Sequence, residues 1–238
     1  GIIFHGNLTI FTQTPLRYSM PDDVKNQMNT APSCPPPDLG GLKKQLGKRV
    51  LDDRFSRGRY ATDASIYQMV PHAVVIPETV EDVRITLDFA RQNGLAVLPR
   101  GGGTSQCGQT VNHAIVLDQT RHLNKMLSLD VENRRCVVQP GIVLDELNRQ
   151  LKPHGLWFPV DVSTSSRATI GGMAGNNSCG GRSLRYGIMR DNVHAIKAIL
   201  SDGSEAWFGA LDTHKPSCKL AEIWPHLEAM GRDNATLI

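Results

Sequence analysis

A glycine-rich loop that leaves a predicted parallel strand constrains this chain more than any other feature. Residues 73–77 are typical of a short buried strand, and residues 78–93 carry apolar side chains at helical spacing. Residues 95–99 and 114–117 predict a second and a third strand. This order indicates a β-α-β unit, so the loop from Arg100 to Gln109 lies at the carboxyl end of a strand, where parallel sheets bind ligands.

The first loop reads Pro-Arg-Gly-Gly-Gly-Thr-Ser from Pro99 to Ser105. Successive glycines let the backbone approach a ligand closely and turn several N–H groups toward phosphate oxygens. Thr104 and Ser105 add hydroxyl donors. An isolated glycine triplet is more often a flexible linker, but its place between two buried strands favours a phosphate loop. Arg100 assists the phosphate, is solvated, or forms a structural salt bridge.

Two well-known phosphate loops do not fit this segment. The Rossmann pattern G-x-G-x-x-G needs a glycine where Gln106 stands. The Walker pattern fits Gly103, Gly108 and Thr110, but Gln109 replaces the lysine that neutralises the β/γ-phosphates. The sequence therefore disfavours hydrolysis of nucleoside triphosphates.

A second loop, residues 158–181, combines small and hydroxyl residues with paired glycines and asparagines. It contains Ala-Thr-Ile-Gly-Gly-Met-Ala-Gly-Asn-Asn-Ser-Cys-Gly-Gly from Ala168 to Gly181. Such a segment packs closely against a flat or phosphorylated ligand. Alone it is weak evidence for a site, and it gains meaning only together with the first loop.

The second half of the chain predicts antiparallel strands. Residues 126–130 and 135–139 flank a polar turn, and residues 194–200 and 205–208 flank Ser-Asp-Gly-Ser, so each pair predicts a hairpin. Residues 142–152 predict a helix. We therefore expect an α+β fold, with a small parallel β-α-β lobe at 70–120 and a larger lobe with antiparallel strands at 121–238.

The N-terminal region carries weaker signals. We expect residues 1–41 to be disordered or extended, because they include the proline-dense stretch Ala-Pro-Ser-Cys-Pro-Pro-Pro, and we interpret residues 1–19 as an upstream extension rather than folded protein. Residues 42–69 are a helical lead-in, with an amphipathic helix at 42–51 and no clear period after Arg54.

Composition excludes several functions. The 26 basic and 23 acidic residues give a net charge of +3 without a basic stripe, which argues against nucleic-acid binding. The 5 cysteines and 8 histidines are scattered without ligand spacing, so we predict no metal site.

No apolar run is long enough to span a bilayer, and no secretory signal is recognisable. We expect a cytoplasmic protein, with a peripheral membrane position through an electron acceptor as the alternative.

The two loops, together with Arg-Tyr-Gly-Ile-Met-Arg-Asp-Asn-Val (185–193) and Ser-Asp-Gly-Ser (201–204), resemble the vanillyl-alcohol-oxidase-type FAD-binding domain, also called the PCMH-type domain. The resemblance covers about residues 60–209. Its nearest branch is the FAD-linked dehydrogenases and oxidases of D-lactate, glycolate and D-2-hydroxyglutarate. Tyr60-Ala-Thr-Asp-Ala-Ser-Ile-Tyr67 resembles long bacterial members that carry an iron–sulfur region toward the C-terminus.

The resemblance implies a set of FAD-binding residues along two walls and beside the ribityl or adenine portion. The first wall comprises Arg100, Gly101, Gly102, Gly103, Thr104, Ser105 and Gln109, supported by Pro140 and Gly141. The second wall comprises Pro159, Asp161, Thr169, Gly171, Gly172 and Asn176, and the remaining positions are Gly187 and Val193. Thr104 occupies the region where some relatives attach flavin covalently through histidine, so we expect dissociable FAD.

The implied reaction is oxidation of a D-2-hydroxy acid to the 2-oxo acid, with electrons leaving the flavin for a downstream acceptor. We expect the FAD domain to be incomplete at its C-terminus, because the family's later Gly-Ser-Glu-Gly-Thr-Leu-type segment and its substrate domain are not found. Any iron–sulfur cluster belongs to the missing C-terminal region. For Tyr186 and His194 a structural role is favoured, and no catalytic residue is assigned.

Two alternatives remain open at this point. The chain is the FAD domain of another oxidase or reductase of the same fold, since the FAD walls do not specify the substrate. Otherwise it is an incomplete, non-catalytic nucleotide-binding fragment.

Overall fold

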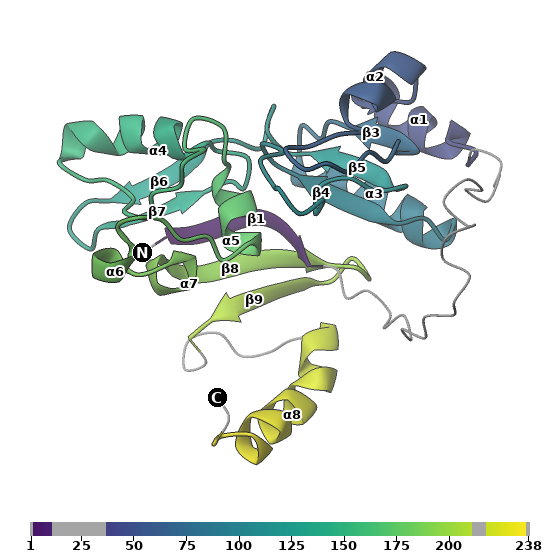
Figure 1. Ribbon diagram of the computed structural model, residues 1–238. Helices are drawn as coiled ribbons and strands as arrows, with labels where there is room; N and C mark the ends of the chain where they lie inside the picture. Colours follow the sequence, from purple (N-terminus) through teal and green to yellow (C-terminus); the bar gives the residue numbers. More distant parts are fainter. Residues whose placement is uncertain (1, 11–36, 211–217, 237–238) are drawn as a thin grey trace, which may run out of the picture.

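The computed structural model describes residues 2–10, 37–210 and 218–236, and builds them on two sheets (Figure 1). A four-stranded sheet has the order β2-β3-β5-β4, and a five-stranded sheet has the order β6-β7-β1-β8-β9. The first sheet combines three strands of residues 70–120 with β2, and the second combines four strands of residues 121–238 with β1. The α+β fold expected from the sequence is confirmed.

The first lobe contains the predicted β-α-β unit. Its elements are α1 (Gly40–Leu46), a 3-10 turn (Gly47–Arg49), β2 (Val50–Leu51), α2 (Arg54–Arg59), β3 (Ala73–Val75), α3 (Val80–Gln92), β4 (Val97–Arg100) and β5 (Ile115–Asp118). Strand β5 pairs in parallel with β3 on one side and with β4 on the other. The expected strand-helix-strand order is therefore confirmed.

Helix α3 begins at a complete capping box. The Thr79 hydroxyl accepts from the Asp82 amide, and the Asp82 carboxylate accepts from the Thr79 amide. These bonds satisfy two of the N–H groups that a helix leaves unpaired at its start. The apolar positions expected to face the core, Val83, Leu87 and Ala90, are all buried.

The helix expected at residues 42–51 is shorter than predicted. Helix α1 ends at Leu46, because Gly47 takes a φ of +56°, and Val50 and Leu51 then pair antiparallel with β3. Glycine adopts a positive φ without steric cost, so it commonly ends a helix. Helix α2 lies in the stretch for which the sequence predicted no period.

The second lobe contains both predicted hairpins. Its elements are β6 (Met126–Asp130), β7 (Arg135–Val138), α4 (Leu144–Leu151), a 3-10 turn (Lys152–His154), α5 (Ile170–Gly175), α6 (Ser183–Tyr186), α7 (Met189–Asn192), β8 (Val193–Leu200) and β9 (Glu205–Gly209). Strands β6 and β7 pair antiparallel, as do β8 and β9. Both predicted hairpins and the predicted helix at 142–152 are confirmed.

The N-terminal strand β1 (Ile2–Ile10) corrects a sequence-based expectation. It pairs in parallel with β7 on one side and with β8 on the other, so the two hairpins form one sheet. The view that residues 1–19 are not folded protein is therefore wrong for residues 2–10. Isoleucine, phenylalanine and threonine are frequent in residues 2–10, and all three have a high propensity for β-strands. Residues 11–36 lie outside the described residues.

Each lobe has its own apolar core, and the lobes touch through α3 and the β8–β9 hairpin. Ile199 of β8 packs into the core of the first lobe. Arg84 of α3 and Lys197 of β8 both form ion pairs with Glu205 of β9. These contacts hold the hairpin against the parallel lobe.

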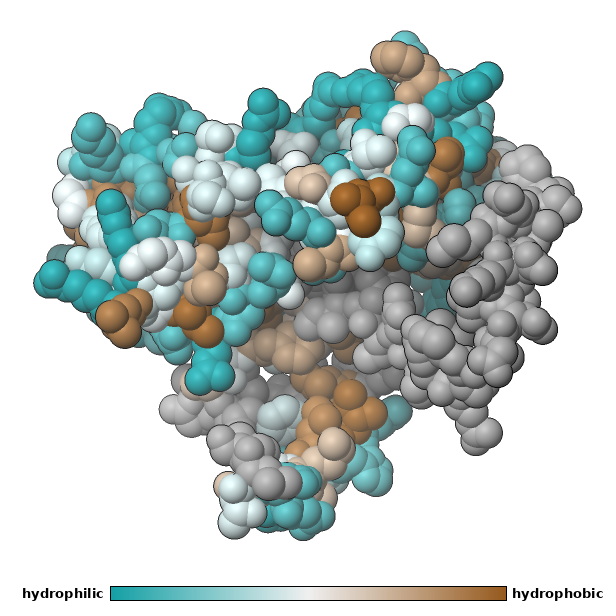
Figure 2. All heavy atoms as spheres, in the orientation of Figure 1, coloured by the Kyte–Doolittle hydropathy of each residue, from teal (hydrophilic) through white to brown (hydrophobic). Residues whose placement is uncertain are grey.

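Helix α8 (Cys218–Asp233) follows β9 and was not predicted. Hydrophobic residues gather over it on the face shown in Figure 2, and Ile223, Leu227 and Met230 are exposed. Among the described helices, none combines the length and the apolar character required to cross a bilayer.

Candidate FAD site

The first glycine-rich loop leaves β4 with unpaired backbone donors. Within the described residues, none of the amides from Gly101 to Gln109 donates a hydrogen bond. The hydroxyls of Thr104 and Ser105 also lack a partner there, and both residues are half-buried. Gly102, Gln106, Cys107 and Gln109 are exposed and the other residues of this run are partly buried, so the backbone donors of the loop are available to an anionic ligand.

The two loops are in contact at their glycines. A Cβ added to Gly101 would lie 2.2 Å from the Thr169 Oγ1, and one added to Gly102 would lie 2.2 Å from the carbonyl oxygen of Arg167. No side chain fits either position, because real Cβ contacts are never this short. The structure therefore brings together the first-loop glycines and the residues immediately before α5, as the sequence predicted.

The start of α5 is held from behind by Pro140. The Gly171 amide donates to the Pro140 carbonyl at 2.8 Å, and the Thr169 Oγ1 accepts from the Gly172 amide at 3.2 Å. Gly141 donates to the Leu123 carbonyl at 2.8 Å. Pro140 thus contacts the second loop, whereas the family resemblance implied that it supports the first.

Arg100 is occupied by the protein itself. Its guanidinium donates to the carbonyls of Tyr60 at 3.0 Å, Thr62 at 2.7 Å and Thr110 at 3.0 Å, and it lies 5.2 Å from the centre of the Tyr60 ring. Burial lowers the pKa of Arg100 from its ordinary value, although nearby Asp63 opposes this effect. The structure thus favours a structural role for Arg100 over contact with the phosphate.

Asp63 holds the far end of the first loop. Its Oδ2 accepts from the Thr110 hydroxyl at 2.8 Å and from the Thr110 amide at 3.4 Å. Gln109, the neighbour of Thr110, is exposed and forms no hydrogen bond within the described residues. In the sequence, the segment around Tyr60 and Asp63 shows only a family resemblance. No spacing in it predicts the contacts with Arg100 and Thr110.

Asp161 shapes the second loop. Its Oδ1 accepts from the Arg182 amide at 3.0 Å. Its carbonyl oxygen lies where a Cβ on Gly180 would stand, so the loop folds back tightly on itself. Pro159 is half-buried, and the Asn176 side chain is exposed and donates to the Ser178 hydroxyl at 3.3 Å.

Gly187 and Val193 lie farther along the chain. Gly187 ends α6 with a φ of +77°, and Val193 begins β8. Val193 lines a cavity of about 330 Å³ together with Asn177, Met189 and Phe208. Val193 thus shares this cavity with Asn177 at the end of the second loop. The other lining residues named here belong to α7 and β9.

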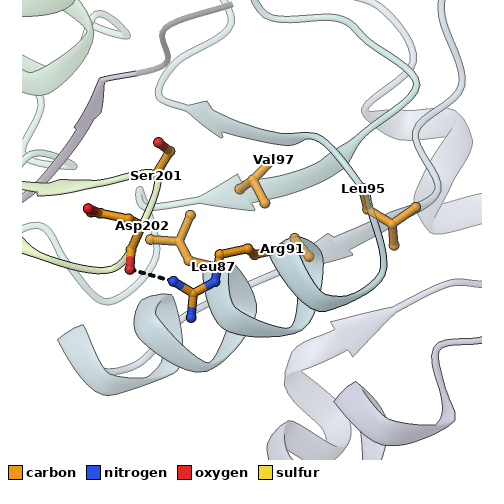
Figure 3. Close-up of a pocket in the computed structure, with 7 residues that line it drawn as sticks. Leu87, Arg91, Leu95, Val97, Ser201 and Asp202 are labelled. Atoms are coloured by element: carbon orange, nitrogen blue, oxygen red, sulfur yellow. Dashed lines mark hydrogen bonds between the residues drawn. The ribbon is translucent and has the colours of Figure 1, made fainter.

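A second cavity of about 300 Å³ lies between α3 and the turn that joins β8 to β9 (Figure 3). Leu87 and Val97 form its apolar floor, and the Arg91 Nη1 donates to the Asp202 carbonyl at 2.7 Å across its mouth. Residues 101–109 line neither of these two cavities. Within the described part of the chain, no three potential metal ligands gather.

Comparison with known proteins decides the family. The profile of the FAD binding domain family matches residues 71–209, which include both glycine loops and every strand of the two sheets except β1 and β2. The chain belongs to this family. The match ends at the last residue of β9, so α8 lies beyond it.

Curated relatives are longer proteins. Over 154 residues the chain is 45% identical to a D-2-hydroxyglutarate dehydrogenase of Haemophilus influenzae, covering 63% of this chain and 15% of that protein. Over 183 residues it is 41% identical to a D-2-hydroxyglutarate dehydrogenase of Pseudomonas putida, covering 74% and 18%. It is 35% identical to a glycolate oxidase subunit of Bacillus subtilis over 171 residues, covering 68% and 36%. The chain spans well under half of each relative.

Solved structures share the fold. An alkyldihydroxyacetonephosphate synthase has a TM-score of 0.65 at 22% identity, covering 74% of this chain and 35% of that one. The 6-hydroxy-D-nicotine oxidase of Arthrobacter nicotinovorans has a TM-score of 0.61 at 21% identity, covering 70% and 36%. At this identity the likeness concerns the fold alone.

Proposed function

We propose that this chain holds the pyrophosphate of FAD on the free amides of residues 101–109, beside the segment that leads into α5. The observation that carries this proposal is the run of amides without partners at a point where two loops touch through Gly101 and Gly102. The residues fit a pyrophosphate, because backbone N–H groups and the hydroxyls of Thr104 and Ser105 are anion-binding donors.

The remaining predicted residues have two proposed roles. Thr169, Gly171 and Gly172 form the opposing wall with the loop of Pro159 and Asp161, while Pro140 and Gly141 support it from behind. Asn176 belongs to the same wall, and we place the ribityl or adenine portion toward Gly187 and Val193, the second of which lines the 330 Å³ cavity.

For the whole protein we propose oxidation of a D-2-hydroxy acid to a 2-oxo acid. The names of the curated relatives support this reaction. FAD would supply the hydride acceptor for this reaction, and the residues described here would bind and orient it. We place the substrate-binding residues, any iron–sulfur cluster and the contact with the electron acceptor outside residues 37–210. A cytoplasmic protein, peripheral to the membrane where that acceptor requires it, fits this scheme.

We further propose that FAD is bound without a covalent bond. Thr104 stands in the loop where a histidine would be needed for attachment, and a threonine hydroxyl hydrogen-bonds a phosphate without reacting. After acid precipitation of the holoprotein, the yellow colour is expected in the supernatant. Colour that stays with the precipitate would contradict this expectation.

The proposed cofactor is tested by titrating the purified chain with FAD and following flavin fluorescence and absorbance. We expect saturable binding in a one-to-one ratio. ADP, which carries the same pyrophosphate, should compete with FAD, whereas riboflavin, which lacks it, should not. Absence of saturable FAD binding would overturn the proposed function.

A further inference from the structure

The glycine loop is held on one side by residues that lie outside the matched family region. The segment Tyr60–Ala64, which we call the back wall, lies between α2 and β3, before residue 71, where the match begins. From the sequence, this segment is expected to be part of a helical lead-in. In the structure it contacts both ends of the glycine loop and its middle.

Three contacts define the back wall. The Arg100 guanidinium, at the start of the loop, bonds to the Tyr60 and Thr62 carbonyls. The Ala64 amide donates to the Gly103 carbonyl at 3.1 Å, in the middle of the loop. Asp63 binds Thr110 at the end of the loop. The same guanidinium also reaches the Thr110 carbonyl, so Arg100 connects the two ends of the loop directly.

These contacts divide the polar groups of the loop into two sets. The Gly103 carbonyl accepts from Ala64 of the back wall. The Thr110 carbonyl accepts from Arg100, which is itself bonded to the back wall. The amides of residues 101–109 remain without partners among the described residues. With Gly103 and Thr110 held by these contacts, the amides of the loop stay available to an anion, and less of the loop has to be ordered when the anion binds.

We propose that Arg100 and Asp63 are positioning residues that shape the glycine loop for the FAD pyrophosphate without touching it. This inference rests on the proposed function. Arg100 suits the task because its planar guanidinium carries several donors in a fixed arrangement and reaches three carbonyls at once. A lysine ammonium has no such fork, so it cannot reproduce the three bonds.

The test is a double-substitution cycle on FAD affinity. Arg100→Lys keeps the charge and removes the fork, and Gly102→Ala places a methyl group where the loops touch. We expect each to weaken FAD binding at least tenfold. Because both act by displacing the same loop, the combined variant should lose less affinity than the product of the two single losses. A merely structural role at a separate place would give the full product.

Arg149→Lys is the matched control, because this exposed arginine also donates to oxygens, those of Glu146 on α4, far along the chain from the loop. It should leave FAD affinity unchanged. If circular dichroism shows Arg100→Lys to be unfolded, Asp63→Asn replaces it in the cycle, since it keeps the side-chain shape and weakens the hold on Thr110.

The outcomes separate the two proposals. A wild-type chain that binds FAD, with an Arg100→Lys variant that binds it equally well, overturns the positioning role and leaves the proposed function intact. Losses that multiply in full also overturn it. A wild-type chain that binds no FAD overturns the proposed function, and the positioning role fails with it.

Discussion

The hydroxyl of Tyr60 donates to the Oδ2 of Asp118 at 2.5 Å, which ties the back wall to the end of β5. Asp118 is 5% exposed, and its other oxygen accepts from the Thr120 amide and hydroxyl. Burial, followed by the hydrogen bond to Asp118, raises the pKa of Tyr60 to about 12. The neutral phenol is therefore the form that stabilises the fold.

The raised pKa of Tyr60 predicts a loss of stability at alkaline pH. The ordinary value is 10.0, so the contribution is fully present below pH 10 and is lost as the pH rises through about 12. Urea denaturation at a series of alkaline pH values should show this decline. The decline should be smaller in Tyr60→Phe, which would also be less stable than wild type at pH 7 by about 1–3 kcal/mol. Equal pH dependence in both proteins would contradict the assignment.

Gly102→Ala is expected to separate the two loops. The added methyl group meets the carbonyl of Arg167, so one loop must move, which should weaken FAD binding at least tenfold. Gly58→Ala in α2 is the control, because nothing lies within 4 Å of the added group. FAD affinity measured by fluorescence quenching should be unchanged in the control, which gains helix propensity. A Gly102→Ala variant with unchanged affinity would argue against the close approach of the loops.

The local elements of the parallel lobe were predictable because each carries its own signal. The buried run at 73–77, the helical spacing up to Gln92 and the glycine-rich loop after Arg100 are all short-range patterns. The partner of each strand in the larger sheet was not predictable. Strand β1 pairs with residues far along the chain, and no local pattern in residues 2–10 specifies β7 and β8 as neighbours.

Glu205→Gln is expected to weaken the contact between α3 and the β8–β9 hairpin. The hydrogen bond from Lys197, together with the charge of Arg84, holds the pKa of Glu205 below its ordinary value of 4.5 despite burial. A lowered pKa means stability that is present above pH 4.5 and is lost as the pH falls below it. Because the carboxylate is 37% exposed, solvent screening limits the loss at pH 7 to less than about 1 kcal/mol.

The Glu205 effect should also respond to salt. Thermal denaturation in 1 M NaCl should shrink the difference between wild type and Glu205→Gln, since screening weakens exposed ion pairs. A difference of the same size at low and high salt would mean that the ion pairs are not its cause.

Leu147→Ala is expected to destabilise the second lobe severely. Leu147 lies on the inner face of α4 and is completely buried in the core of that lobe. Its truncation leaves a cavity, with a cost of about 2–5 kcal/mol in the free energy of unfolding. Leu184→Ala is the matched control, because that side chain is fully exposed, and urea denaturation should find no comparable change. Equal effects would contradict the packing of α4.

The candidate site was only partly predictable from sequence. Gly101, Gly102 and Thr169 are recognisable by residue type, and the structure brings them together. The structural contacts of Arg100 were not predictable, because its three acceptors are backbone carbonyls, which any residue provides. Only the folded arrangement shows that this arginine is occupied, and so changes its expected role from cofactor contact to support.

Strand β1 has a kinetic consequence. Its partners in β7 and β8 begin about 130 and 190 residues later in the chain, as the pairs Ile2–Cys136 and Ile2–Val193 show. During synthesis β1 emerges before both of its neighbours and pairs only after they have been made, and closing such long loops slows folding. We therefore expect the parallel lobe, whose strands lie within residues 50–118, to form early, and the larger sheet to close last.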